Sequence, residues 1–509
     1  MSCLTRRDLS GSRAAGTGPA TDGDVPAEVS RGRSSGCTSR EGPNRRGNAG
    51  TRISGAVVMQ KRREPDLGNG EGRKPEPSTG SHQAGPARKE DPGAEELATM
   101  EAVVARENML RAWRQVERNK GAAGVDGLEV KDALAHLRGH WEGIKASLLE
   151  GNYEPQNVRR VDIPKEGGGT RMLGVPTVTD RLIQQAVLQI LTPVFDPDFS
   201  RSSYGFRPGR SAHEAVQAAK EHIRAGHDWV VDLDLSKFFD RVHHDILMSR
   251  VEKRVRDKRL LKLIRGWLTA GMMQDGVVQE RGEGTPQGGP ISPLLANIML
   301  DDLDKRLEAT GHRFCRYADD CNVYVRSKRA GERVMTWMRR YLEGKLRLLV
   351  NEEKSAVDRP ENRKFLGFSF QRGRKVKVRV AGKSWVRFKE KVRNLTQRSR
   401  GCSLKAMISR LNVYLIGWRG YFRLAELPGE MEEADAWIRR RLRCFVLRQW
   451  KRPRTRACEL HRLGAHEAWT MAGSSKGVWC LSKTKAAHSG LKNEFFTGLG
   501  LASLAEAHA

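Results

Sequence analysis

The segment from residue 314 to residue 325 constrains the fold more than any other part of the chain. It consists of a short apolar run, the tetrad Tyr317-Ala318-Asp319-Asp320 and a second apolar run. Apolar runs of this length on both sides of a turn predict a hairpin of two antiparallel strands. A lone pair of aspartates is usually just a turn. A pair at the tip of a predicted hairpin indicates a site for chemistry.

A second pair of carboxylates lies upstream. Residues 230–235 alternate, so Val231, Leu233 and Leu235 face one side of a predicted strand while Asp232 and Asp234 face the other. Carboxylates on a buried strand are costly unless they are paired or bind metal. For Asp232 and Asp240 we favour a structural role, ion pairing or hydrogen bonding near the strand. If strand and hairpin share one sheet, Asp234 and Asp319 converge, and such oxygen ligands suit two Mg²⁺ ions roughly 3.5–4 Å apart that promote phosphoryl transfer.

The charge balance indicates a polyanionic partner. Lys and Arg number 91 against 61 Asp and Glu, which gives a formal net charge of +30. Basic side chains that neutralise phosphates release counterions, so nucleic acid is favoured over a membrane surface. No apolar run is long enough to span a bilayer, and no apolar stretch follows the N-terminal arginines as in a secretory signal. The eight scattered cysteines favour free thiols in a reducing cytoplasm over a structural zinc.

Residues 1–95 differ from the rest of the chain. Gly, Ser, Pro and Arg are abundant there, and the first aromatic residue of the chain is Trp113. Such a segment buries too little apolar surface to offset its ordering entropy, so we predict a disordered basic tail. Met59 offers an alternative start.

The region after residue 370 is strongly basic. Residues 371–460 contain 25 Lys and Arg against 7 Asp and Glu, a net charge of +18. Apolar residues at helical spacing predict amphipathic helices over 404–422 and 437–450. The bland interpretation is a helical bundle with a solvated face. Arginines interleaved with aromatic residues favour a nucleic-acid surface instead. The arginines concerned are Arg439, Arg440, Arg441, Arg443 and Arg448.

These motifs resemble those of reverse transcriptases. The tetrad at 317–320 looks like their catalytic box, 234–240 resembles the aspartate motif before it, and 284–297 resembles the motif between the two. The order and spacing match as well. Further segments extend the resemblance to group II intron-encoded proteins of bacterial, class C-like type, from Leu97 almost to the C-terminus. They are 119–127, 163–177, 204–211, 348–355 and 365–368.

The resemblance implies an α+β right-hand polymerase. Fingers and palm with an antiparallel sheet would occupy 96–370, an all-α thumb or maturase domain X would occupy 371–455, and 456–509 would form a short DNA-binding region. Many relatives end in an endonuclease domain with paired cysteines. Cys458 and Cys480 are isolated, so we expect that domain to be absent.

The resemblance also implies catalytic roles. Asp234 and Asp319 would ligate both Mg²⁺ ions, and Asp320 would help to shape the metal site. Lys354 would donate a proton to the leaving pyrophosphate. The alternative for Lys354 is an ordinary solvated lysine.

Further residues would bind the nucleotide. Lys165 and Arg171 would hold the incoming triphosphate by their charge. Gln287 and Gly288 would place the nucleotide against the template. Phe239 matches the family's steric gate, whose ring crowds a ribose 2′-OH and so favours deoxynucleotides.

The function implied is an RNA-directed DNA polymerase that also promotes splicing and homing of its intron. Its partners would be group II intron RNA, an RNA template, target DNA and deoxynucleoside triphosphates, with RNA contacts from Arg439, Arg440 and Arg443. Two alternatives stay open: an RNA-binding maturase that acts in splicing only, and another bacterial reverse transcriptase of retron, diversity-generating or CRISPR-associated type. The intact carboxylates and the long basic region disfavour both.

Overall fold

The computed structural model describes residues 98–506, except for 165–169, 275–276, 280–281, 400 and 473. The predicted tail at 1–95 and Lys165 therefore lie outside the described residues. Among the helices that the structure describes, none is both long and apolar enough to span a membrane.

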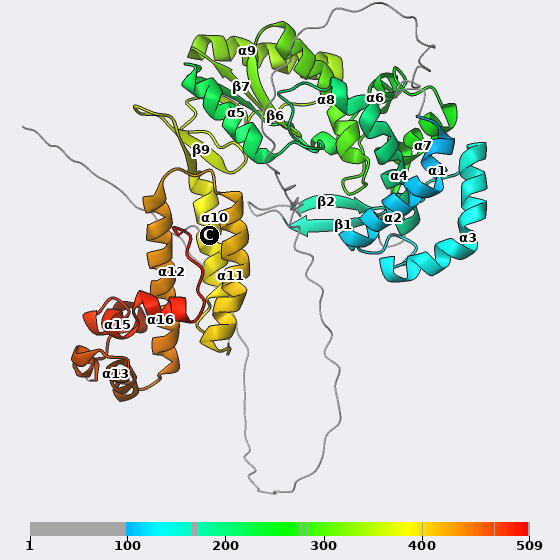
Figure 1. Cartoon of the computed structure of the whole chain (residues 1–509). Coiled ribbons are helices and arrows are strands. Elements are labelled where there is room, and N and C mark those ends of the chain that lie inside the picture. The colour runs from blue at the N-terminus through cyan, green and yellow to red at the C-terminus, as the bar shows by residue number, and fades with distance from the viewer. Residues whose placement is uncertain are drawn as a thin grey trace, which may run out of the picture. The chain divides into compact units, whose positions relative to one another are not determined.

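The first part of the fold, the fingers, combines helices with a small sheet (Figure 1). The sheet has the strand order β2-β1-β4-β5, in which β1 pairs antiparallel with β2 and parallel with β4. Its strands are β1 (Val158–Pro164), β2 (Thr170–Val175), β4 (Met272–Gln274) and β5 (Val277–Gln279). The helices before and beside it are α1 (Met100–Val104), α2 (Arg106–Asn119), α3 (Val130–Glu150) and α4 (Val178–Phe195).

The palm is built on a second sheet with the order β6-β7-β3-β8, and every pairing in it is antiparallel. Its strands are β3 (Trp229–Leu233), β6 (Arg313–Tyr317), β7 (Asp320–Val325) and β8 (Ala356–Asp358). The alternation predicted for 230–235 is confirmed, because Val231, Leu233 and Leu235 are buried in one hydrophobic core while Asp232 stays partly exposed. The predicted hairpin at 314–325 is also confirmed as β6 and β7.

Three helices pack on the palm sheet (Figure 1). They are α5 (Ala212–Arg224), α8 (Ser292–Ala309) and α9 (Lys328–Tyr341). Helix α6 (His244–Val251) packs on α8, and α7 (Lys258–Thr269) packs on α6 and α3. Short single-turn elements follow α4 at Asp196–Asp198, precede α6 at Phe238–Asp240 and follow α9 at Leu342–Leu346. Helix α5 begins with a capping box, in which Ser211 and Glu214 satisfy each other's backbone N–H groups.

The thumb follows, and it begins with a hairpin that the sequence analysis did not predict. Strands β9 (Phe368–Gln371) and β10 (Lys377–Val380) pair antiparallel, so the predicted boundary at 370 falls inside β9. The thumb helices are α10 (Gly382–Leu395), α11 (Leu404–Tyr421) and α12 (Pro428–Gln449). Their core contains a cluster of aromatic rings with centroids 4.5–5.4 Å apart, from Trp385, Phe388, Trp418 and Phe422.

The C-terminal part is a set of short helices packed against α12. They are α13 (Pro453–Arg462), the 3₁₀ helix His466–Met471, α14 (Val478–Leu481), α15 (Lys485–Gly490) and α16 (Asn493–Gly498). Asp435 of α12 accepts hydrogen bonds from the backbone N–H groups of Leu504 and Ala505 and from the Ser503 hydroxyl. A buried carboxylate thus ties the end of the chain to the thumb. The predicted α+β fold with a helical region after the palm is confirmed.

Candidate active site

The two carboxylate motifs meet at one end of the palm sheet. Asp234 follows the last residue of β3, and β3 pairs with β7 so that Leu233 lies opposite Cys321. Asp320 is the first residue of β7, and Asp319 belongs to the two-residue turn between β6 and β7. The sheet register therefore places both motifs at the same end of the strands, as the sequence predicted.

The turn that carries Asp319 has an unusual backbone. Ala318 adopts a φ of +58°, which L-residues rarely adopt. A positive φ at the first central position is the geometry that two-residue hairpin turns favour. Gly205 packs directly against it, because a Cβ on Gly205 would lie only 2.3 Å from the Ala318 amide nitrogen. Only glycine at 205 lets the two segments approach this closely.

A buried hydrogen-bond network holds the turn from below. The Arg316 guanidinium donates to the Asp304 carboxylate, with the closest N–O pair at 2.6 Å, and both side chains are buried. Arg316 Nη1 also donates to the Ala318 carbonyl at 3.0 Å and to Asn297 Oδ1 at 2.9 Å. Asn297 Nδ2 in turn donates to the Gly205 carbonyl at 2.9 Å. One network therefore links the turn to the 284–297 and 204–211 segments.

Arg316, Asn297 and Gly205 lie within the sequence motifs but were assigned no role, and Asp304 lies outside every motif. The signal was an arginine after the apolar pair Phe314–Cys315, since Arg316 is buried in β6 while Arg313 at its start is exposed. A fully buried arginine must have a charged partner. Its partner Asp304 lies on α8, and spacing along the chain does not reveal which carboxylate that is.

The carboxylate cluster repels added negative charge. Asp320 as a whole residue is exposed at the end of the sheet, but the surrounding protein partly desolvates its carboxyl, and this desolvation raises its pKa. Repulsion from Asp319, Asp232 and Asp234 raises the pKa further, to about 7. Four carboxylates close enough to repel one another form a region that attracts cations.

Asp232 forms an ion pair with Arg363. Arg363 Nη2 lies 2.7 Å from Asp232 Oδ2, and Arg363 Nε donates to the same oxygen at 2.9 Å. Burial raises the pKa of Asp232, and Arg363 opposes that shift. This is the ion-paired role that the sequence analysis favoured.

Lys354 lies beside Asp234, one of the two predicted metal ligands. Its Nζ is 3.0 Å from Asp234 Oδ2, although the lysine side chain is 67% exposed. The backbone of Asp234 is also hydrogen-bonded to this segment, because its carbonyl accepts from the Asn351 N–H at 2.8 Å. A long, mobile ammonium beside Asp234 can move when a divalent cation and a triphosphate enter.

The donor set fits a hard divalent cation that shares its ligands with substrate. Within the described residues, no three His, Cys, Asp or Glu side chains form a group that could hold a metal ion alone. Mg²⁺ is usually bound by one or two carboxylates together with phosphate oxygens and water. Asp234 and Asp319 supply such carboxylates, and a triphosphate would supply the remaining oxygens.

The predicted nucleotide-binding residues are only partly described. Lys165 lies outside the described residues, and Arg171 is described only as a backbone position of β2 opposite Ile163. Phe239 is buried, and its carbonyl accepts from the Thr285 N–H at 2.7 Å. This bond joins the aspartate motif to the 284–297 segment.

Gly288 and Gln287 pack against the fingers sheet. Gly288 has a φ of +141°, and a Cβ there would lie 2.5 Å from the Gly174 carbonyl oxygen. The Gln287 carbonyl accepts from the Gly174 N–H at 3.0 Å. The backbone of this loop is thus attached to β2, the strand that carries Arg171.

One of the predicted RNA contacts is corrected by the structure. Arg443 is buried, and its Nε donates to the Leu491 carbonyl at 2.9 Å. Arg440 lies 3.6 Å above the Trp479 ring and donates to the Trp479 carbonyl. Both attach the C-terminal segment to α12, so Arg443 has no surface left for a phosphate. Arg439 is partly exposed.

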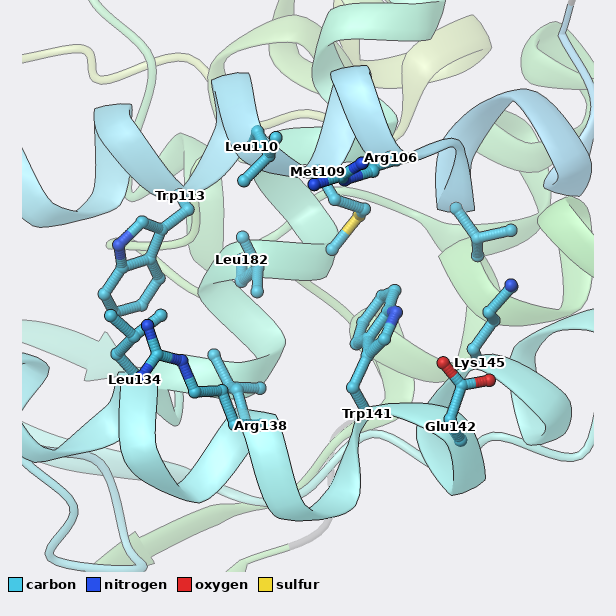
Figure 2. Close-up of a pocket in the computed structure, with 12 residues that line it drawn as sticks. Arg106, Met109, Leu110, Trp113, Leu134, Arg138, Trp141, Glu142, Lys145 and Leu182 are labelled. Carbon is cyan, nitrogen blue, oxygen red and sulfur yellow. The ribbon is translucent and has the colours of Figure 1, made fainter.

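An apolar groove lies away from the carboxylates, between α2, α3 and α4 (Figure 2). It encloses about 520 Å³, with Trp113 on one wall, Trp141 on the other and Leu182 at its floor. Glu142 is the one acidic residue among the side chains that line it. This groove therefore lacks the paired carboxylates of a metal site.

Comparison with known families matches two parts of the chain. Residues 163–370 match the family described as reverse transcriptase (RNA-dependent DNA polymerase), and residues 386–464 match the group II intron maturase-specific domain. The first match covers the palm carboxylates, and the second covers most of the thumb.

Individual relatives agree with these matches. Protein YkfC of Escherichia coli (strain K12) is 34% identical over 307 residues, which cover 52% of this chain and 81% of that protein. Group II intron-encoded protein LtrA of Lactococcus lactis subsp. cremoris is 39% identical over 195 residues, 38% of this chain and 32% of that protein. The chain thus spans about a third of LtrA. A solved structure titled "Partial Cas6-RT-Cas1--Cas2 complex" is 25% identical, covering 48% of this chain and 42% of that chain, with a TM-score of 0.32 that supports no conclusion.

Proposed function

The chain belongs to the family of group II intron reverse transcriptases and maturases, which makes it an RNA-directed DNA polymerase with a maturase domain, and on that premise we propose that it uses two Mg²⁺ ions to copy RNA into DNA and binds its intron RNA to promote splicing and homing. The observation that carries this proposal is the meeting of Asp234 with the Asp319–Asp320 turn at one end of the palm sheet.

The polymerase reaction joins a primer to a deoxynucleotide. The primer 3′-oxygen loses its proton and forms a bond to the α-phosphorus, while the bond to the β-phosphate breaks and pyrophosphate leaves. Asp234 and Asp319 would hold the metal ions, which when bound supply positive charge to the attacking and leaving oxygens. Lys354 starts 3.0 Å from Asp234. It would pass a proton to the leaving pyrophosphate, a general-acid role.

Selection of deoxynucleotides would fall to Phe239. Its ring is buried and packs edge-on against Phe238, with centroids 5.1 Å apart. A ring supported in this way resists displacement, so a ribose 2′-OH pressed against it is excluded by sterics rather than by a lost hydrogen bond.

The maturase role needs a surface for RNA phosphates, and we assign it in part to a basic hollow at the palm–thumb junction. The hollow encloses about 700 Å³ and is formed by α5, the loop between β9 and β10 and the α11–α12 loop. Six of its residues are cations and two are anions. They are Lys220, Arg224, Arg372, Arg374, Lys375, Lys377, Asp228 and Glu426.

Both anions of the hollow are paired with its own cations. Arg372 lies 2.9 Å from Asp228, and Lys220 lies 2.8 Å from Glu426. Three further cations are exposed, so their charges face solvent: Arg374, Lys375 and Lys377. Asp228 precedes β3 and Asp234 follows it, so the hollow lies about 20 Å from the carboxylates at ~3.3 Å per strand residue. RNA bound there would leave the polymerase site free.

A splicing-only maturase is the second candidate, and primer extension decides between the two. Purified protein with an RNA template, a DNA primer and deoxynucleotides should synthesise DNA with Mg²⁺ and stop when a chelator is added. Added group II intron RNA should splice faster with the protein. Faster splicing without DNA synthesis would leave the splicing-only function. DNA synthesis without any effect on intron RNA would leave another type of bacterial reverse transcriptase.

The RNA surface has its own test. Changing Arg374, Lys375 and Lys377 together to Gln should reduce the slope of log K against log salt for intron RNA by about 2–3, at ~0.7–0.9 per lost phosphate contact. A control that changes Arg329, Arg333 and Arg340 on α9 to Gln removes equal charge elsewhere. Equal effects of the two triple variants would refute the assignment of the hollow.

A further inference from the structure

Phe206 is an anomaly beside the catalytic turn. Its side chain is 53% exposed, and its backbone has a φ of +59°. A single exposed apolar side chain needs no explanation by itself. A bulky residue with a positive φ does need an explanation, because this backbone conformation is strained and an exposed side chain gains no packing energy that offsets the strain.

The neighbours of Phe206 enforce this conformation. On one side, Gly205 packs on the Ala318 amide and its carbonyl accepts from Asn297. On the other side, Arg207 pairs with Asp196 at 2.7 Å and donates to the Ser200 carbonyl at 2.6 Å. The segment is thus fixed on both sides of Phe206. Strain that surrounding structure maintains in this way is typical of functional sites.

The strained ring is presented next to the catalytic tetrad. The centroids of Phe206 and Tyr317 are 6.3 Å apart, with an angle of 45° between the rings. Tyr317 is two residues from Asp319 in the chain. An exposed aromatic face at this place is available to a planar ligand that is bound at the metal site.

We propose that the Phe206 ring is a stacking surface for a nucleobase at the polymerase site. The inference rests on the proposed polymerase function. The base belongs to the incoming nucleotide or to the template–primer, and the chemistry is the same for both. Every base has a π-face, so stacking on an aromatic ring tolerates all four bases. A polymerase needs such a contact, because it must hold whichever nucleotide the template specifies.

The test separates the contribution of the Phe206 ring to ligand binding from the contribution of its strained backbone to stability. Phe206→Gly removes the ring and relieves the positive φ, so the Tm should stay the same or rise by about 2 °C. The Kd of the incoming nucleotide or of the template–primer should nevertheless rise about 5- to 100-fold, for all four bases. A rise in the first Kd identifies the nucleotide as the stacked ligand, and a rise in the second identifies the template–primer. Phe206→Trp keeps an aromatic face and should stay within about threefold of wild type.

Lys120→Gly is the matched control. Lys120 is exposed, has a φ of +45° and ends α2. Its replacement relieves the same kind of strain and should leave both Kd values unchanged. The inference is refuted if Phe206→Gly leaves both Kd values within twofold, or if Phe206→Trp binds as weakly as Phe206→Gly. Absence of DNA synthesis by the wild-type protein would instead refute the proposed function.

Discussion

Gly205→Ala should slow DNA synthesis by displacing the catalytic turn. The added methyl carbon would lie 2.3 Å from the Ala318 nitrogen and 2.9 Å from the Tyr317 carbonyl carbon, where ordinary contacts begin at 3.4 Å. Arg207 and Asn297 hold the Gly205 segment, so the two-residue turn has to move, by about 1 Å. A shift of ~1 Å in a catalytic group slows reaction about 100-fold. This corresponds to about 2.7 kcal/mol of transition-state stabilisation.

Single-turnover incorporation of one deoxynucleotide measures this loss. The rate constant at saturating nucleotide should fall about 100-fold, while the Kd of template–primer stays within about threefold, because the turn acts on the reacting atoms. Gly139→Ala is the control: Gly139 lies within α3, and a Cβ there meets nothing within 4 Å. It should leave the rate unchanged. A Gly205→Ala protein that is folded and reacts within threefold of wild type would refute this account of the turn.

Three further changes test neighbouring parts of the site. Phe239→Val should raise the efficiency of ribonucleotide incorporation relative to deoxynucleotide by at least tenfold, and an unchanged ratio would remove Phe239 as the steric gate. Lys354→Ala should lower the incorporation rate constant about 10²- to 10⁴-fold, as loss of a general acid does, and Lys354→Arg should recover little because guanidinium does not release its proton; a rate within threefold would make Lys354 an ordinary solvated lysine. Asn297→Ala removes one acceptor of Arg316 and the side-chain donor to the Gly205 carbonyl, while Arg316 keeps Asp304, so the free energy of unfolding should fall by about 1–3 kcal/mol; a loss below about 0.5 kcal/mol in chemical denaturation would show that the network does not support the turn.

Local patterns in the sequence predicted the carboxylate strand and the hairpin, because alternation along a strand reports directly which face is buried. The register that brings Asp234 to the turn then followed from a single assumption, that the two elements share a sheet. The β9–β10 hairpin was missed. Its strands have four residues each, and the charged loop between them carried the basic signal that suggested a helical region throughout.

Arg443 shows why the helical face was misjudged. Spacing identifies the apolar stripe of α12, but it does not show that the chain returns 48 residues later to cover another face. Leu491 and Phe496 arrive there, and Arg443 donates to the first and stacks near the second. The same limit applies to Arg316, whose partners lie 12, 19 and 113 residues away. Contacts over such separations are set by tertiary packing, which periodicity does not encode.

The most direct test of the account is to remove the turn carboxylates and measure both activities. Asp319→Asn with Asp320→Asn keeps side-chain volume but removes two charges at the metal site. DNA synthesis should fall by several orders of magnitude, at tenfold for each ~1.4 kcal/mol of lost stabilisation. Splicing of the intron RNA should persist nearly unchanged, because it depends on the basic surfaces and not on these carboxylates. If the double variant, shown to be folded by circular dichroism, loses splicing as completely as synthesis, or if it still makes DNA at the wild-type rate, the account is wrong.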